Sequence, residues 1–86
     1  MFVVAVYDVA QEKNRKVLKF LRARMHWVQN SVFEGELTEG ELREIKDYLE
    51  EVTDIGDSVI IYQMGNKKYI AREVIGEEKG SSSQVL

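Results

Sequence analysis

The chain has 86 residues, of which 31% are charged, with no cysteine, one histidine and a net charge of -3. This length predicts one small domain that buries about 60 to 65% of its unfolded surface, so pairing with a second copy would add stability. The composition excludes disulfides, thiolate zinc sites and histidine clusters, leaving hard cations on carboxylates as the metal chemistry to expect. The N-terminal apolar run is too short for a membrane span and carries no cleavage signal, so we expect a cytoplasmic protein without membrane contact.

Charge is distributed unevenly along the chain. Residues 1–33 contain six basic and two acidic side chains, whereas residues 34–57 contain ten acidic and two basic ones. The first part would attract phosphate and the second would repel it, so the acidic part is expected to face away from nucleic acid or toward a protein partner. The solvated outer faces of two helices explain the same charges equally well.

The first predicted element is a strand in residues 1–9, which reads F-V-V-A-V-Y-D from Phe2 to Asp8. A run of apolar, largely β-branched residues is typical of a strand that is buried on both faces and central in its sheet. Asp8 ends the run at the rim of the sheet, which makes it the first candidate for chemistry. Asp8 and Gln11 also have the spacing of a capping box, in which Asp8 would instead cap the following helix.

Residues 11–25 have the periodicity of a helix with one apolar side and a basic exterior. His26 and Trp27 are expected to close this helix, with His26 interacting with the helix dipole. Trp27 and Phe33 could stack on nucleobases, but a place in the core or in an interface is the stronger expectation for both. The apolar side consists of Val17, Leu18, Leu21 and Met25.

Residues 28–37 return to extended character, with Gly35 suggesting a bend. We therefore expect two short strands that form a hairpin. Thr38 and Glu41 then predict a capping box at the start of a second helix, and Gly56 follows the end of that helix.

Residues 58–64 predict another buried strand, residues 65–66 a turn, and residues 67–75 a weaker final strand. The order predicts an α+β, ferredoxin-like βαββαβ sandwich with an extra C-terminal strand and two helices on one face of an antiparallel sheet. The domain would span residues 1–76, with its last strand at an exposed edge of its own sheet or packed on the partner subunit. Residues 77–86 are expected to be a flexible polar tail.

A single carboxylate at Asp8 is a poor site for Mg2+, which prefers octahedral oxygen ligands from one or two carboxylates and several waters. A two-fold dimer that brings the two first strands together would supply the second carboxylate. A metal held in this way could activate a bound water and polarise a phosphoryl oxygen, which is the minimum for phosphodiester hydrolysis.

Three features of the sequence resemble one known family. They are Tyr7-Asp8-Val9 at the end of the first strand, the basic first helix, and V-Q-N-S-V-F-E-G in residues 28–35. Together they resemble the small CRISPR-associated proteins of the spacer-acquisition machinery, the Cas-two family. The resemblance implies a homodimer with a metal-binding Asp8 pair and nuclease activity on single-stranded RNA or duplex DNA. It also implies a central position between two dimers of the larger integrase protein.

Through this resemblance, Asp8 takes the metal-binding and catalytic position, with Mg2+ or Mn2+ as the cation. The basic surface of the first helix, which includes Arg22, would contact phosphates without reading sequence, so binding should weaken steeply with salt. One departure is Trp27, which stands where the family often has an arginine. The residues expected to contact nucleic acid are Tyr7, Arg15, Lys16, Lys19, Ser31 and Phe33.

Three alternatives stay open. The chain could be a non-catalytic scaffold that binds duplex DNA and bridges integrase dimers, with Asp8 as a cap or an interface group. It could also be a toxin-type ribonuclease of the same fold. A ferredoxin-like RNA-binding module ranks lower, because the first strand offers only Phe2 and Tyr7, at its two ends, for base stacking.

Overall fold

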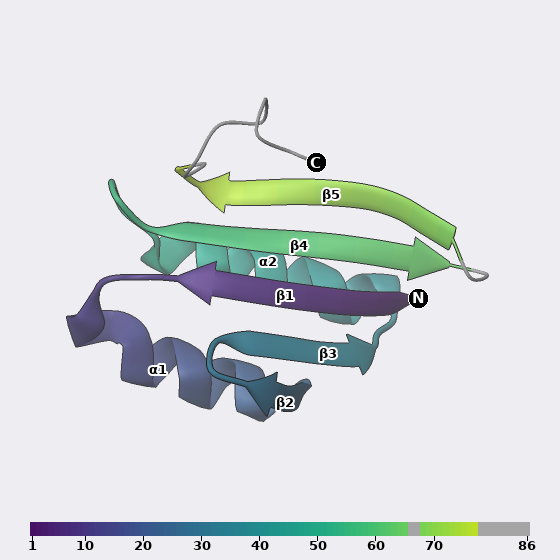
Figure 1. Cartoon of the computed structure of the whole chain (residues 1–86), viewed down its shortest axis with the longest axis horizontal. Helices are drawn as coiled ribbons and strands as arrows, with labels where there is room; N and C mark the ends of the chain where they lie inside the picture. Colours follow the sequence, from purple (N-terminus) through teal and green to yellow (C-terminus); the bar gives the residue numbers. More distant parts are fainter. Residues whose placement is uncertain (66–67, 78–86) are drawn as a thin grey trace.

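The computed structural model describes residues 1–65 and 68–77, with side chains of residues 68–70 left out. The order of its elements is the predicted one (Figure 1). The expected turn at residues 65–66 and the expected tail at residues 77–86 fall largely outside the described residues. The elements are β1 (Phe2–Asp8), α1 (Gln11–Arg22), β2 (His26–Gln29), β3 (Val32–Glu36), α2 (Glu39–Val52), β4 (Ser58–Gly65) and β5 (Lys68–Gly76).

The five strands form one antiparallel sheet in the order β2-β3-β1-β4-β5. The first strand, β1, is central as predicted, because it pairs with β3 on one side and with β4 on the other. The extra strand β5 pairs with β4 of its own chain, from Ser58 opposite Gly76 to Gly65 opposite Lys68. This pairing leaves β5 at an edge of the sheet, and its packing on a partner subunit stays a prediction.

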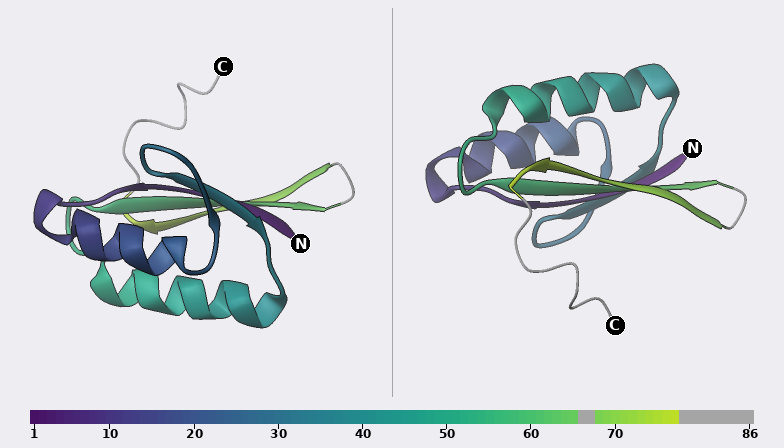
Figure 2. Two further views of the ribbon diagram at one scale, coloured as in Figure 1. Left: turned by 90° about the horizontal axis from the view of Figure 1, so that it is seen from below. Right: turned by 90° about the horizontal axis from the view of Figure 1, so that it is seen from above.

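Both helices lie on one face of the sheet, which confirms the α+β, ferredoxin-like fold (Figure 2). Side chains of β1 alternate between this face and the other, so Val3, Ala5 and Tyr7 are buried beneath the helices. The core that they share with the helices and neighbouring strands includes Val17, Leu21, Phe33, Ile45, Leu49, Val59 and Ile61.

The hairpin of β2 and β3 confirms the two short strands but corrects their details. Helix α1 ends at Arg22, and His26 and Trp27 belong to β2 instead of closing the helix, so the predicted dipole role of His26 is wrong. The turn falls at Asn30, whose φ of 45° is one that asparagine tolerates better than most residues. Gly35 lies inside β3 opposite Val3, and the irregularity occurs in β2 between Trp27 and Gln29.

Helix α2 begins as predicted. The backbone N–H of Glu41 donates to Thr38 Oγ1 at 3.1 Å, and the Thr38 N–H donates to Glu41 Oε1 at 2.8 Å. This reciprocal capping box fixes the helix start just after β3. Within the described ranges, no helix is both long enough and apolar enough to cross a membrane.

Candidate functional site: Asp8 and the open face of the sheet

Asp8 is the last residue of β1 and is exposed. In register it lies opposite Ser58, the first residue of β4. The N-cap of α1 is Ala10, so the hypothesis that Asp8 is the capping residue of this helix is wrong. By the alternation of β1, Asp8 shares a face with Val4 and Val6, opposite to the buried Tyr7.

The face that Asp8 shares is the one that neither helix covers (Figure 2). We call its partly exposed apolar residues the open face. The register places Val6 between Ile60 and Val32, so the apolar side chains of neighbouring strands adjoin one another. The expectation that β1 is buried on both faces is therefore wrong for a single chain. The open face consists of Phe2, Val4, Val6, Val32, Ile60, Tyr62, Met64 and Val74.

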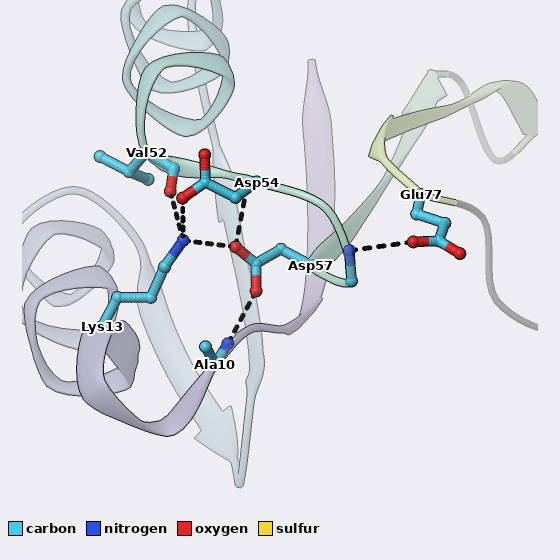
Figure 3. Close-up of polar contacts among 7 residues, drawn as sticks. Ala10, Lys13, Val52, Asp54, Asp57 and Glu77 are labelled. Carbon is cyan, nitrogen blue, oxygen red and sulfur yellow. Dashed lines mark hydrogen bonds and ion pairs between the residues drawn. The ribbon is translucent and has the colours of Figure 1, made fainter.

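A buried ionic cluster holds the two loops beside the end of β1 (Figure 3). Asp57, which precedes β4, is 2% exposed, and its Oδ1 accepts the Ala10 N–H at 2.8 Å. Its Oδ2 accepts the Asp54 N–H at 2.9 Å and contacts the Lys13 ammonium at 2.5 Å. The same ammonium donates to the carbonyl oxygen of Val52 at 2.8 Å. Asp57 thus joins the start of α1 to the loop after α2, immediately before the residue that pairs with Asp8.

The cluster strongly favours an ionised Asp57. The hydrogen bond from Lys13 is the main cause that lowers the pKa of Asp57 from 3.8 to about 2, with further help from the backbone N–H groups of Asp54 and Ala10. Desolvation by burial acts in the opposite direction and is outweighed. Hydrogen bonds to the carboxylates of Asp57 and Asp54 raise the pKa of the Lys13 ammonium, and Asp57 is the larger cause.

This lowered pKa predicts how stability depends on pH. A carboxylate with a lowered folded-state pKa stabilises the fold fully above its unfolded-state pKa, and the contribution is lost as the pH falls through the folded-state value. Between pH 4 and pH 2 we expect the free energy of unfolding of the wild type to lose about 2 kcal/mol relative to Asp57→Asn. Denaturant titrations at a fixed protein concentration measure this difference.

Asp54→Asn is the matched control, because Asp54 contacts the same lysine but its side chain is 82% exposed. Its stability should follow the wild-type pH profile. Parallel profiles for wild type and Asp57→Asn would contradict the account of the cluster.

The predicted basic residues of α1 are brought together only in part. Arg15, Lys19 and Arg22 line one surface depression with Leu18, and all three are exposed. Lys16 is exposed but does not line it. We call Arg15, Lys19 and Arg22 the α1 cations.

The α1 cations lie on a side of the helix that does not contact α2. The side of α1 next to α2 presents Phe20, which stacks on Tyr48 at 3.7 Å between ring centroids. In the turn that follows α1, Arg24 contacts Glu44 of α2 at 3.2 Å. The acidic helix α2 therefore lies beside α1, on the same face of the sheet (Figure 2). Phosphates attracted to the α1 cations would lie on the side of α1 away from α2.

Tyr7 and Phe33 were expected to contact nucleic acid, but both lie in the core. Tyr7 is 3% exposed and Phe33 is fully buried, with their rings stacked 6.3 Å apart. Burial also raises the pKa of the Tyr7 phenol. Ser31 is half-buried, and its carbonyl oxygen accepts the Tyr7 N–H at 3.1 Å. These positions argue against direct contacts of the two rings with nucleic acid and indicate that the motif around Phe33 fixes the fold.

The exposed carboxylate of Asp8 offers oxygen ligands of the kind that Mg2+ and Mn2+ prefer, although one carboxylate alone is a poor site for either cation. In residues 1–65 and 68–77, no three histidine, aspartate or glutamate side chains gather at a single point. The described part of one chain thus offers no ready-made cluster of ligands around Asp8.

These features define a class: a small ferredoxin-like α+β protein with an exposed carboxylate at the end of its central strand and a cationic first helix. Comparison with known proteins identifies the family. The family model described as CRISPR associated protein Cas2 matches residues 1–72. The chain belongs to this family, which confirms the predicted resemblance.

Individual relatives match along their whole length. A protein named CRISPR-associated endoribonuclease Cas2 from Methanosarcina acetivorans is 46% identical, with all of both chains covered. One of the same name from Pyrococcus furiosus is also 46% identical, again over all of both chains. A solved structure described as a crystal structure of cas2 has a TM-score of 0.75 and 37% identity, covering 100% of this chain and 98% of the other. The likeness therefore includes β5 as well as the βαββαβ unit.

Proposed function

We propose that this protein is a metal-dependent endonuclease of CRISPR spacer acquisition that works as a homodimer. Its relatives are named endoribonucleases, so single-stranded RNA is the first substrate to expect and duplex DNA the second. One observation carries the proposal: Asp8 lies on the side of the sheet that the helices leave uncovered, together with the apolar residues of the open face.

A second copy is the occupant that best fits the open face. Two sheets that pack through apolar faces form a core, as in other two-sheet proteins, and a two-fold axis makes one patch complementary to itself. Asp8 lies at one end of β1, beyond Val6. An axis that passes near this end brings the two carboxylates together, and a homodimer thereby acquires the pair that one chain lacks.

In this proposal the chain's own groups divide the work. The two Asp8 carboxylates hold the cation, and the α1 cations hold the phosphates of the substrate. Mg2+ or Mn2+, when bound, supplies a polarised phosphoryl oxygen and a bound water of lowered pKa. The larger integrase protein is the proposed partner, and the cytoplasm is the proposed location.

The test is cleavage of labelled single-stranded RNA and of duplex DNA by the wild-type protein, after light scattering has established its oligomeric state. Cleavage should occur with Mg2+ or Mn2+ and stop with EDTA. Intact substrates after incubation with a well-folded dimer, across a range of pH, would overturn the catalytic part of the proposal.

A non-catalytic scaffold is the second candidate, and one observation favours it. The α1 cations are on the helix side of the sheet, whereas Asp8 belongs to the opposite face. Nucleic acid held along α1 therefore need not reach Asp8. A scaffold would bind duplex DNA equally well with and without the Asp8 carboxylate. It would also show no metal-dependent cleavage.

A further inference from the structure

Trp27 is unusual because it is the only tryptophan of the chain and is 45% exposed. It lies in β2 opposite Phe33, which is fully buried. Its indole Nε1–H donates to the carbonyl oxygen of Asn30 at 2.8 Å, in the turn of the hairpin. The ring is thus held in place by its polar edge while much of its surface stays accessible.

A cationic group lies beside this ring. The guanidinium carbon of Arg22 is 5.6 Å from the centroid of the Trp27 ring. Arg22, Met25, His26 and Trp27 line one surface depression. Arg22 also lines the neighbouring depression with Arg15 and Lys19. The two depressions therefore share a residue, and the surface of the α1 cations continues to an exposed aromatic ring.

We propose that Trp27 stacks on an unpaired nucleobase of a strand whose phosphates lie along the α1 cations. A cationic track with an aromatic platform is how proteins hold single strands without reading their sequence, since every base presents a π-face. A base inside a duplex is stacked on both sides and offers no free face to the indole. The proposal rests on the proposed binding of nucleic acid and specifies where an unpaired segment is held.

The position of α2 also supports a nucleic-acid strand on the side of the molecule that carries the α1 cations and Trp27. The acidic helix α2 lies beside α1, and its Glu44 forms an ion pair with Arg24 in the turn that follows α1. Like charge on α2 disfavours a strand on that side. The α1 cations and Trp27 provide the surface away from it, toward the β2 edge of the sheet.

The test uses Trp27 as its own reporter, because no other tryptophan contributes to fluorescence. The wild-type protein in EDTA is titrated with oligothymidylate, with oligouridylate and with a blunt duplex of the same length. Anisotropy of an end-labelled strand measures binding separately. We expect saturable quenching of the tryptophan by both single strands and little quenching by the duplex.

Two variants and one control sharpen the result. Trp27→Ala should bind single strands at least about fivefold more weakly, and Trp27→Phe should recover most of that loss, because base stacking needs an aromatic ring. Val28→Ala is the matched control, since Val28 is the next residue of β2 and is also 45% exposed. It should bind like the wild type, and circular dichroism shows whether each variant is folded.

Two results separate this inference from the function that it rests on. Binding seen by anisotropy with no quenching, and with unchanged affinity of folded Trp27→Ala, would overturn base stacking and leave nucleic-acid binding intact. A failure of every strand to bind the wild type would overturn both. Quenching of Trp27 by the added integrase protein, with no quenching by any strand, would show that Trp27 belongs to a protein interface. This result would also overturn the proposal.

Discussion

Asp8→Asn is expected to reduce Mg2+-dependent cleavage by about 10³-fold, because several kcal/mol of transition-state stabilisation depend on the bound cation and each 1.36 kcal/mol is tenfold in rate. Asparagine has nearly the shape of aspartate but lacks the charge that attracts a hard cation. In a homodimer the substitution removes both carboxylates at once. The measurement is the initial rate of cleavage of labelled single-stranded RNA at saturating Mg2+.

The control for this variant is Glu12→Gln, which removes one exposed carboxylate from the first turn of α1. Its cleavage rate should match that of the wild type. Light scattering should show that Asp8→Asn keeps the oligomeric state of the wild type. Cleavage by purified Asp8→Asn at the wild-type rate would contradict the catalytic assignment of Asp8.

Val4→Lys is expected to weaken cleavage strongly even though Asp8 is unchanged. Val4 lies in the middle of β1 on the open face, between Glu34 of β3 and Tyr62 of β4. In a single chain the introduced ammonium is solvated and faces Glu34, so the sheet is retained. In a packed dimer the same charge would be buried, which costs several kcal/mol. We expect a folded monomer with at least about 100-fold weaker cleavage at concentrations where the wild type is a dimer.

Val28→Lys provides the comparison, because it places the same charge on an exposed apolar residue of the edge strand β2. This variant should remain dimeric and active. A Val4→Lys monomer that cleaves as fast as the wild type would mean that one chain contains the whole site. A Val4→Lys variant that stays dimeric would mean that the open face is not the interface.

The order of elements could be predicted because each one has a local signal. The capping box of Thr38 and Glu41 marked the start of α2, and the apolar run from Phe2 to Tyr7 marked a central strand. The same run also predicted burial on both faces, and one chain buries only one. That difference is informative, because residues such as Val4 are as apolar as core residues and need a second surface that covers them.

The end of α1 was predicted wrongly for a physical reason. Met25 is buried, and it continues the apolar spacing of Val17 and Leu21, so the periodicity alone extends the helix to residue 25. The chain instead turns after Arg22, where the N–H groups of Arg24 and Met25 both donate to the carbonyl oxygen of Leu21. Met25 fills the core from this turn, and His26 begins the next strand.

The position of Asp8 could be predicted because it depends on the local sequence, whereas the contacts around it could not, because they join residues far apart in the chain. Asp8 followed from its place at the end of a strand. The contact of Lys13 with Asp57 joins residues 44 positions apart, and no local pattern indicates that these two side chains meet. The burial of Phe33 agrees with the stronger expectation for its ring. The expected contacts of Tyr7 and Phe33 with nucleic acid came from the resemblance, and strand alternation does not tell which face the helices cover.

The claim that two Asp8 carboxylates share one cation is tested most directly by counting bound metal. Mn2+ is titrated into the wild-type protein and into Asp8→Asn, with free Mn2+ followed by electron paramagnetic resonance and the oligomeric state by light scattering. The account predicts one Mn2+ per two chains in the wild type and none in the variant. One Mn2+ per chain, or an equal number bound by Asp8→Asn, would contradict it.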